Sequence, residues 1–155
     1  MGVKGQRQGS LDGKGLTIGI VAARYNREIV DALLEGAMEV LKEQGAKADP
    51  ILSVPGSYEI PLAAQAIADK GDVDAVICLG CVIKGETAHF EHVAEAAAKG
   101  ILDVSLETGV PCIFCVLTTY TEQQARARMD KGREAAETAI EMANLLKLVR
   151  GSGKS

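Results

Sequence analysis

Four short apolar runs recur along the chain, and a stretch with helical periodicity separates each run from the next. The runs cover residues 16–23, 50–54, 74–83 and 111–119, are rich in Val and Ile, and carry no alternating polar face. Strands that are apolar on both faces and alternate with helices are typical of a parallel sheet that is covered on both sides. The pattern therefore predicts one α/β domain with a four-stranded parallel sheet.

The helical patterns cover residues 27–45, 60–71, 89–109 and 121–149, and we expect one helix from each. In the first of them, Ile29, Leu33, Ala37, Val40 and Leu41 fall on one face. Packing such faces on both sides of the sheet gives a three-layer sandwich of the flavodoxin-like type. We expect residues 14–149 to form this domain. The polar residues 1–13 are expected to be a flexible N-terminal segment, and residues 150–155 a flexible tail or a cloning remnant.

The bulk composition narrows the classes of function. The chain has 155 residues, of which 47% are hydrophobic and 25% charged, the balance of a soluble globular protein. A net charge of −4 argues against a nucleic-acid surface, which needs a basic face. No apolar run approaches the roughly 18 residues of a membrane span, and no signal-peptide core follows the N-terminus. We therefore expect a cytoplasmic protein with no nucleic-acid or membrane partner.

Two Cys-x-x-Cys pairs, Cys78 with Cys81 and Cys112 with Cys115, raise the question of a zinc site. Both pairs lie inside predicted strands. Positions i and i+3 of a strand point to opposite faces, so neither pair can easily hold one ion. We therefore expect four reduced cysteines in the core and no metal.

The few aromatic residues concentrate where a ligand would bind. Tyr25, Tyr58, Phe90 and Tyr120 fall at or just past the carboxyl end of a predicted strand, and Phe114 lies within the last one. Ligands of open parallel sheets bind beyond these ends, so the rings suggest a stacking site for a flat heterocycle. Corners between strands and helices also collect rings for purely structural reasons, and placement alone leaves both interpretations open.

The segment GETAHFEH, residues 85–92, follows the third predicted strand and contains both histidines. Thr87 is a plausible N-cap, and the free N–H groups after Gly85 would face an anion such as phosphate. His89, beside that anion site, is better placed for proton transfer than for binding a metal. His92 lies one turn further along the helix and is expected to be structural or partly exposed.

A phosphate site also calls for cations, and QQARARMDKG, residues 123–132, offers Arg126, Arg128 and Lys131. The alternative is that these charges solvate a helix face.

Six segments together resemble the 6,7-dimethyl-8-ribityllumazine synthase family. They are ARYN (23–26), VPGSYEIPLA (54–63), LGCVIKGETAHFEHV (79–93), FCVLTT (114–119), EQQARAR (122–128) and KGREAAETAIEMANL (131–145). The resemblance runs from about residue 14 to residue 148, in order. The second and third segments are the most specific.

The resemblance implies an enzyme of riboflavin biosynthesis. Family members condense 5-amino-6-(D-ribitylamino)uracil with 3,4-dihydroxy-2-butanone 4-phosphate, release phosphate and water, and use no metal or redox cofactor. It also implies a homopentamer, in some members closed into a 60-subunit shell, and riboflavin synthase as a partner. Three alternatives stay open. One is a catalytically silent or engineered assembly subunit on the same scaffold, and another is the archaeal-type riboflavin synthase, which has no phosphate substrate. The third, a nucleotide- or flavin-binding module, is suggested by the fold alone.

The resemblance further implies a role for each matching residue, with His89 as the proton carrier. The residues implied to bind the pyrimidine and ribityl groups are Tyr25, Ser57, Tyr58, Glu59, Val82, Ile83 and Phe114. The residues implied to bind phosphate are Gly85, Glu86, Thr87, Arg128 and Lys131. Of these, Phe114 and Arg128 match residues that reach a site on the adjacent subunit.

This chain departs from the family pattern at two places. The linker that follows Arg128 is shorter by several residues, and in the family this linker influences whether pentamers close into shells. The departure leaves open whether this chain forms a shell and how far Arg128 reaches. Cys115 stands where the family often has glycine, which crowds the strand beside Phe114.

Overall fold

The computed structural model describes residues 4–85 and 89–151. In that part of the chain strands and helices alternate, as the apolar pattern predicts. The elements are β1 (Thr17–Ala23), α1 (Arg27–Glu43), β2 (Lys47–Val54), the 3-10 helix η1 (Ser57–Glu59), α2 (Ile60–Lys70), β3 (Ala75–Ile83), α3 (His89–Thr108), β4 (Cys112–Thr119), α4 (Glu122–Arg126) and α5 (Lys131–Val149).

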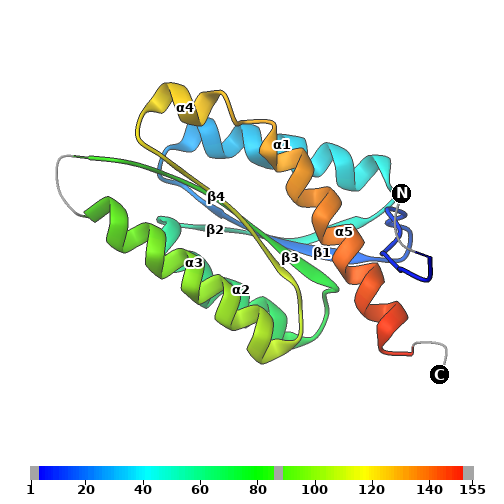
Figure 1. The fold of residues 1–155 in the computed structure, drawn as a ribbon. Coiled ribbons are helices and arrows are strands. Elements are labelled where there is room, and N and C mark those ends of the chain that lie inside the picture. The colour runs from blue at the N-terminus through cyan, green and yellow to red at the C-terminus, as the bar shows by residue number, and fades with distance from the viewer. Residues whose placement is uncertain (1–3, 86–88, 152–155) are drawn as a thin grey trace.

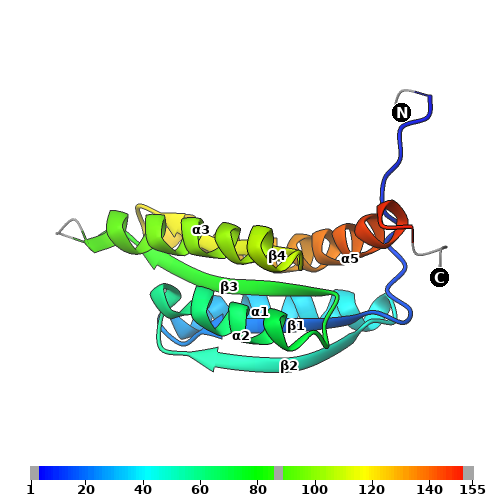
Figure 2. The same cartoon turned by 90° about the horizontal axis from the view of Figure 1, so that it is seen from below.

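The four strands form one parallel sheet in the order β2-β1-β3-β4. Figure 1 shows the sheet between two helical layers, with α1 and α5 on one face and α2 and α3 on the other. In the view of Figure 2 the strands follow one another from β4 to β2. The predicted fold class, a three-layer α/β sandwich, is confirmed.

Side chains of the central strands alternate between two apolar clusters, one under each helical layer. In β1, for example, Ile18 and Ile20 face α1 and α5, whereas Val21 faces α2 and α3. Both Cys-x-x-Cys pairs are divided in the same way. Cys78 and Cys112 lie in the cluster under α2 and α3, and Cys81 and Cys115 lie in the other. The expectation that each pair points to opposite faces, with all four thiols buried and reduced, is confirmed.

The edge strand β2 departs from the expected pattern in length and in burial. It begins at Lys47 rather than at Pro50, and its exposed and half-buried positions alternate from Lys47 to Ser53. The pairing of β1 with β2 shifts register between Ile18 and Ile20. β2 lies at the edge of the sheet, where the helical layers cover its side chains only in part.

The fourth helical pattern forms two helices rather than one, so the prediction of a single helix over 121–149 is wrong. A reciprocal capping box between Thr121 and Gln124 begins α4, and a turn over 127–130 separates α4 from α5. Beyond the turn, Gly132 packs so closely on the carbonyl oxygen of Leu33 that a Cβ atom would overlap it. The break at 127–130 thus comes just before the point where α5 packs closely against α1, and periodicity alone does not report such a contact.

The segment before β1 contacts the far end of α5. The amide of Asn144 donates to the carbonyl oxygens of Ser10 (2.8 Å) and Asp12 (2.9 Å), and Gly13 donates its N–H to the Gln44 carbonyl (2.9 Å). These bonds hold residues 10–13 against α1 and α5. That residues 1–13 are flexible in solution stays a prediction. No helix among residues 4–85 and 89–151 has both the length and the apolarity needed to cross a membrane.

Candidate active site

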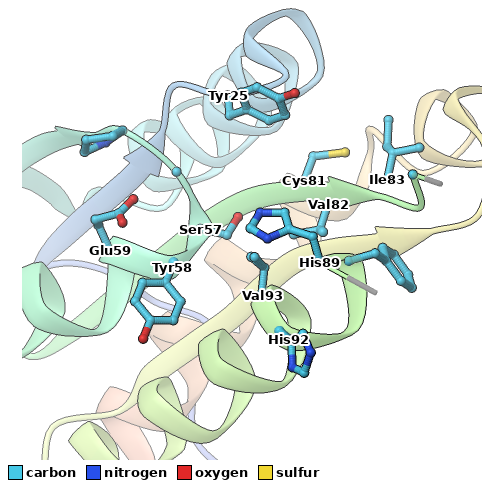
Figure 3. Close-up of a pocket in the computed structure, with 14 residues that line it drawn as sticks. Tyr25, Ser57, Tyr58, Glu59, Cys81, Val82, Ile83, His89, His92 and Val93 are labelled. Atoms are coloured by element: carbon cyan, nitrogen blue, oxygen red, sulfur yellow. The ribbon is translucent and has the colours of Figure 1, made fainter. Parts of the chain in front are cut away.

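A cavity of about 790 Å³ opens at the carboxyl ends of β1, β2 and β3, beside the start of α3. This is the edge of the sheet at which a stacking site was one of the two interpretations of the aromatic pattern. The lining residues are Tyr25, Pro55, Gly56, Ser57, Tyr58, Glu59, Cys81, Val82, Ile83, Gly85, His89, Phe90, His92 and Val93. In the view of Figure 3, Tyr25 and Tyr58 lie on opposite sides of the cavity, and the ring of His89 lies between them.

Hydrogen bonds to both neighbouring strands hold the corner that carries Tyr25. The next residue, Asn26, adopts a left-handed backbone conformation (φ 60°), one that asparagine tolerates better than most residues. Its amide donates to the Cys81 carbonyl (2.7 Å), and the Tyr25 N–H donates to the Pro55 carbonyl (3.2 Å). The Tyr25 side chain is 73% exposed. The backbone is thus fixed while the ring stays accessible for stacking.

The segment after β2 supplies one small buried polar group and two exposed side chains. Ser57 is 5% exposed and lies so close to Gly80 of β3 that a Cβ atom there would overlap its Oγ. Tyr58 and Glu59 are exposed at the cavity. Glycine at position 80 therefore makes the room in which the Ser57 hydroxyl sits.

The end of β3 and the start of α3 form the opposite wall of the cavity. Val82 and Ile83 are half-buried, and the Lys84 N–H donates to the Thr119 carbonyl of β4 (2.9 Å). Gly85 is exposed, with open space where a side chain would stand. Glu86 and Thr87, including the expected N-cap role of Thr87, lie outside the described residues. His89 is exposed and begins α3.

Phe114, Arg128 and Lys131 do not line this cavity. They line a second hollow of about 650 Å³ between β4, the other edge strand, and the start of α5. The Arg128 guanidinium donates to the Gln124 carbonyl (2.8 Å), and the Lys131 ammonium lies 3.3 Å from the Glu134 carboxylate. Within one chain, then, the residues expected to bind the substrates form two separate groups. Phe114, Arg128 and Lys131 lie in the second hollow, and the other described ones line the cavity.

Arg126 contributes to neither group. Its guanidinium pairs with Glu28 of α1 (2.7 Å) and with Glu122 of α4 (2.8 Å). The guanidinium lowers the pKa of the Glu28 carboxyl by hydrogen bonding and by charge attraction. Of the three cations in the segment, Arg126 therefore joins α4 to α1, a role that neither the phosphate interpretation nor the helix-face alternative predicted.

Sequence reasoning missed part of the cavity wall. Cys81 was expected to be a core residue only, and Pro55, Gly56 and Val93 were not singled out. The Val-Pro-Gly turn before Ser57 is the one signal that could have pointed to Pro55 and Gly56. His92, expected to be structural or partly exposed, is exposed and lines the cavity with His89.

Burial raises the pKa of the Cys81 thiol to about 11, and the negative charge of Glu122 adds to the effect. At neutral pH the thiol is therefore protonated and forms an apolar part of the wall rather than a nucleophile. Among residues 4–85 and 89–151, no three His, Cys, Asp or Glu side chains gather as ligands for a metal ion.

Comparison with known proteins identifies the family of this chain. The family model of 6,7-dimethyl-8-ribityllumazine synthase matches residues 15–147. A 6,7-dimethyl-8-ribityllumazine synthase of Paraburkholderia phymatum is 49% identical over 144 residues, covering 91% of this chain and 84% of the relative. One of Salinibacter ruber is 47% identical over 151 residues, covering 93% of this chain and 97% of the relative. The chain therefore belongs to the 6,7-dimethyl-8-ribityllumazine synthase family.

Proposed function

We propose that the cavity beyond β1, β2 and β3 is the site at which this chain makes 6,7-dimethyl-8-ribityllumazine in riboflavin biosynthesis. The substrates are 5-amino-6-(D-ribitylamino)uracil and 3,4-dihydroxy-2-butanone 4-phosphate, and the enzyme is a transferase. One observation carries the proposal: in a member of this family, a single cavity brings together Tyr25, Ser57, Glu59 and His89 from three different segments.

The pyrimidine half of the site follows from the wall chemistry. The accessible rings of Tyr25 and Tyr58 offer faces on which a flat uracil ring can stack. Ser57 and Glu59 supply a hydroxyl and a carboxylate for the polar edge of the pyrimidine and for the ribityl chain. Val82 and Ile83, at the end of β3, contact the ring, largely through their backbone.

The phosphate half is shared between two subunits in this proposal. Gly85, together with Glu86 and Thr87, forms the phosphate loop of one subunit. Arg128 and Lys131 come from the neighbour, as does Phe114, which covers the pyrimidine. Their position in a separate hollow supports this arrangement, because within one chain they do not line the cavity. A closed ring then has one complete site at each interface, and a pentamer has five.

The reaction needs orientation and proton transfer more than covalent help from the protein. The 5-amino group attacks the ketone carbon, and the carbinolamine loses water to give an imine. Phosphate then leaves together with a proton from the carbon next to the imine, and the resulting enol rearranges to a ketone. The second amine attacks this ketone and closes the ring with loss of another water. Holding two substrates together supplies much of the rate. Cationic groups stabilise the departing phosphate. His89 carries protons between the reacting nitrogen and oxygen atoms.

The family resemblance also supports a cytoplasmic homopentamer, with a 60-subunit shell as a further assembly and riboflavin synthase as a partner that consumes the product. The turn at 127–130 is short, and in the family this region influences whether pentamers close into a shell. Whether this chain forms a shell is therefore the question to test. Light scattering after size-exclusion chromatography separates a pentamer from a shell. A fully active monomer would contradict the shared site.

A subunit-mixing assay tests the proposal directly. Purified protein is supplied with both substrates, and lumazine absorbance and phosphate release are followed together. His89→Ala and Arg128→Ala chains are then co-expressed, so that about one quarter of the interfaces combine an intact cavity with an intact arginine. We expect the mixed oligomers to be faster than either parent. Activity no higher than the mean of the parents would place Arg128 and the cavity in the same subunit.

His89→Ala should slow turnover without abolishing it, because positioning of the substrates survives the substitution. We expect a fall in kcat of roughly a hundredfold, the usual scale of one acid-base group, with little change in KM for either substrate. Full kcat at every pH tested would exclude His89 as the proton carrier. No turnover by the unaltered protein, with the uracil still bound, would favour the silent assembly subunit.

A further inference from the structure

We propose that Tyr120 is a positioning residue for His89, which it places by packing against Phe90 on the first turn of α3. This inference rests on the proton-carrier role proposed for His89. The centroids of the Phe90 and Tyr120 rings lie 6.0 Å apart with the rings tilted by 37°. That distance is within the range in which aromatic pairs attract. Phe90 directly follows His89, so the contact acts on the turn that carries the imidazole.

Phe90 is the one buried residue in the first turn of α3, residues 89–92. The buried residues of α3 are Phe90, Ala97, Ile101 and Val104, and of these only Ile101 and Val104 belong to an apolar cluster of the core. Phe90 thus stands two helical turns away from the next buried residue. The position of the turn depends on what packs against the Phe90 ring, and Tyr120 is a partner that the structure identifies.

Tyr120, although its side chain is 67% exposed, has a well-held backbone. Its N–H donates to the side-chain oxygen of Gln124 (2.8 Å), the residue that closes the capping box with Thr121. One residue earlier, the carbonyl of Thr119 accepts from Lys84 at the end of β3 (2.9 Å), and its hydroxyl donates to the Thr121 carbonyl (2.9 Å). The ring therefore projects from a corner that is fixed to β3, β4 and α4.

In this geometry the Tyr120 ring packs against the first turn of α3 and helps to fix its position. Without the ring, Phe90 loses one of its packing partners on the first turn of α3, and we expect the His89 imidazole to shift from its position in the cavity. A proton-transfer group that is displaced by about 1 Å loses much of its effect on the rate, whereas ground-state binding by other residues changes little. The Tyr120 hydroxyl has no part in this role.

The test compares Tyr120→Ala with Tyr120→Phe, which keeps the ring and serves as the matched control. We expect Tyr120→Ala to lower kcat by roughly tenfold with both KM values within about twofold of those of the unaltered protein. Tyr120→Phe should retain normal kcat. Equal thermal unfolding and equal oligomeric state establish that the variants fold. If Tyr120→Ala does not fold, Tyr120→Leu, which keeps apolar volume without the ring, takes its place.

A double-mutant cycle separates positioning from a general structural effect. In a His89→Ala background, Tyr120→Ala should cause almost no further loss, because the group that it positions is already absent. An equal loss in both backgrounds, or normal kcat in Tyr120→Ala, would overturn the inference while the unaltered enzyme still turns over. If instead His89→Ala has no effect on kcat, the proposed role of His89 fails, and this inference fails with it.

Discussion

Substitution of Gly80 by alanine should disturb the stability of the sheet and the substrate cavity together. Gly80 lies in the middle of β3, and an added methyl group would overlap the Oγ atom of Ser57. It would also lie 3.3 Å from Ile60 Cδ1 and 3.4 Å from Val116 Cγ1. Because Ser57 is 5% exposed, its hydroxyl has little space into which it can move. The new methyl group must displace Ser57 or spread the packing around it.

The size of the effect follows from two opposing contributions. Overpacking of a filled core costs about 1–3 kcal/mol. Alanine restricts the unfolded chain more than glycine does. Where the backbone conformation suits both residues, this raises the free energy of unfolding by about 0.4–1 kcal/mol. Gly80 is not among the described glycines with positive φ, so alanine fits its backbone. We therefore expect a net loss of about 1–2 kcal/mol in the free energy of unfolding.

For a chain of this length, the loss corresponds to a fall in Tm of roughly 2–8 °C, measured at matched protein concentration. Because Ser57 also lines the cavity, KM for the uracil substrate should rise about fivefold. Gly19→Ala is the matched control, since Gly19 lies in the central strand β1. Its methyl group would meet Ile67 Cγ2 at 3.0 Å, a looser contact than the overlap with Ser57 Oγ at Gly80, and it lies away from the cavity. The control should show a smaller fall in Tm and an unchanged KM.

Removing the hydroxyl should relieve the overlap. Gly80→Ala combined with Ser57→Ala should recover at least half of the loss in Tm, while the weakened binding of the uracil persists. If Gly80→Ala unfolds at the same temperature as Gly19→Ala and binds the uracil normally, the reasoning from this close approach is refuted. The same holds if Ser57→Ala does not restore stability to the double variant.

The remaining predictions concern α4, α5 and the buried thiols. Arg126→Gln should remove the ion pair between α4 and α1 and so disturb the position of Arg128, two residues further on. We expect KM for the butanone phosphate to rise about threefold, a modest effect because exposed ion pairs contribute little. An unchanged KM would show that the Glu28 contact does not orient Arg128. Gly132→Ala should destabilise the chain by at least the roughly 1–3 kcal/mol of ordinary overpacking, since its methyl group would overlap the rigid Leu33 carbonyl, and a normal Tm would disprove this. Burial raises the pKa of Cys81 and of two further thiols from 9.0 to about 11, so the folded protein keeps protons that the unfolded chain loses. The free energy of unfolding should therefore be unaffected by these thiols below about pH 9 and fall between about pH 9 and 11. Thermal unfolding measured across this range tests the prediction, and a constant Tm would contradict it.

The apolar pattern was sufficient for the order of strands and helices and for the layers, apart from the start of β2 and the break between α4 and α5. A continuous apolar run such as residues 74–83 buries its side chains only where both faces of the strand are covered. Strands that are joined one after another by helices then pair in parallel. The opposite orientations of Cys78 and Cys81 were also predictable, because they follow from the two-residue period of a single strand. The same holds for the placement of Tyr25 and Tyr58, since a residue that follows a parallel strand must lie at its carboxyl end. Each of these predictions depends on local geometry alone.

The division of the site depends instead on contacts between distant segments. Arg128 and His89 match one family site in the sequence, yet in the fold they lie in separate hollows, since β4 stands at the edge of the sheet. The break between α4 and α5 stands next to the close approach of Gly132 to Leu33, which are about 100 residues apart in sequence. The pairing of Tyr120 with Phe90 has the same origin. Periodicity describes which face of an element is apolar, whereas the distance at which two such faces meet is set only when the whole chain packs.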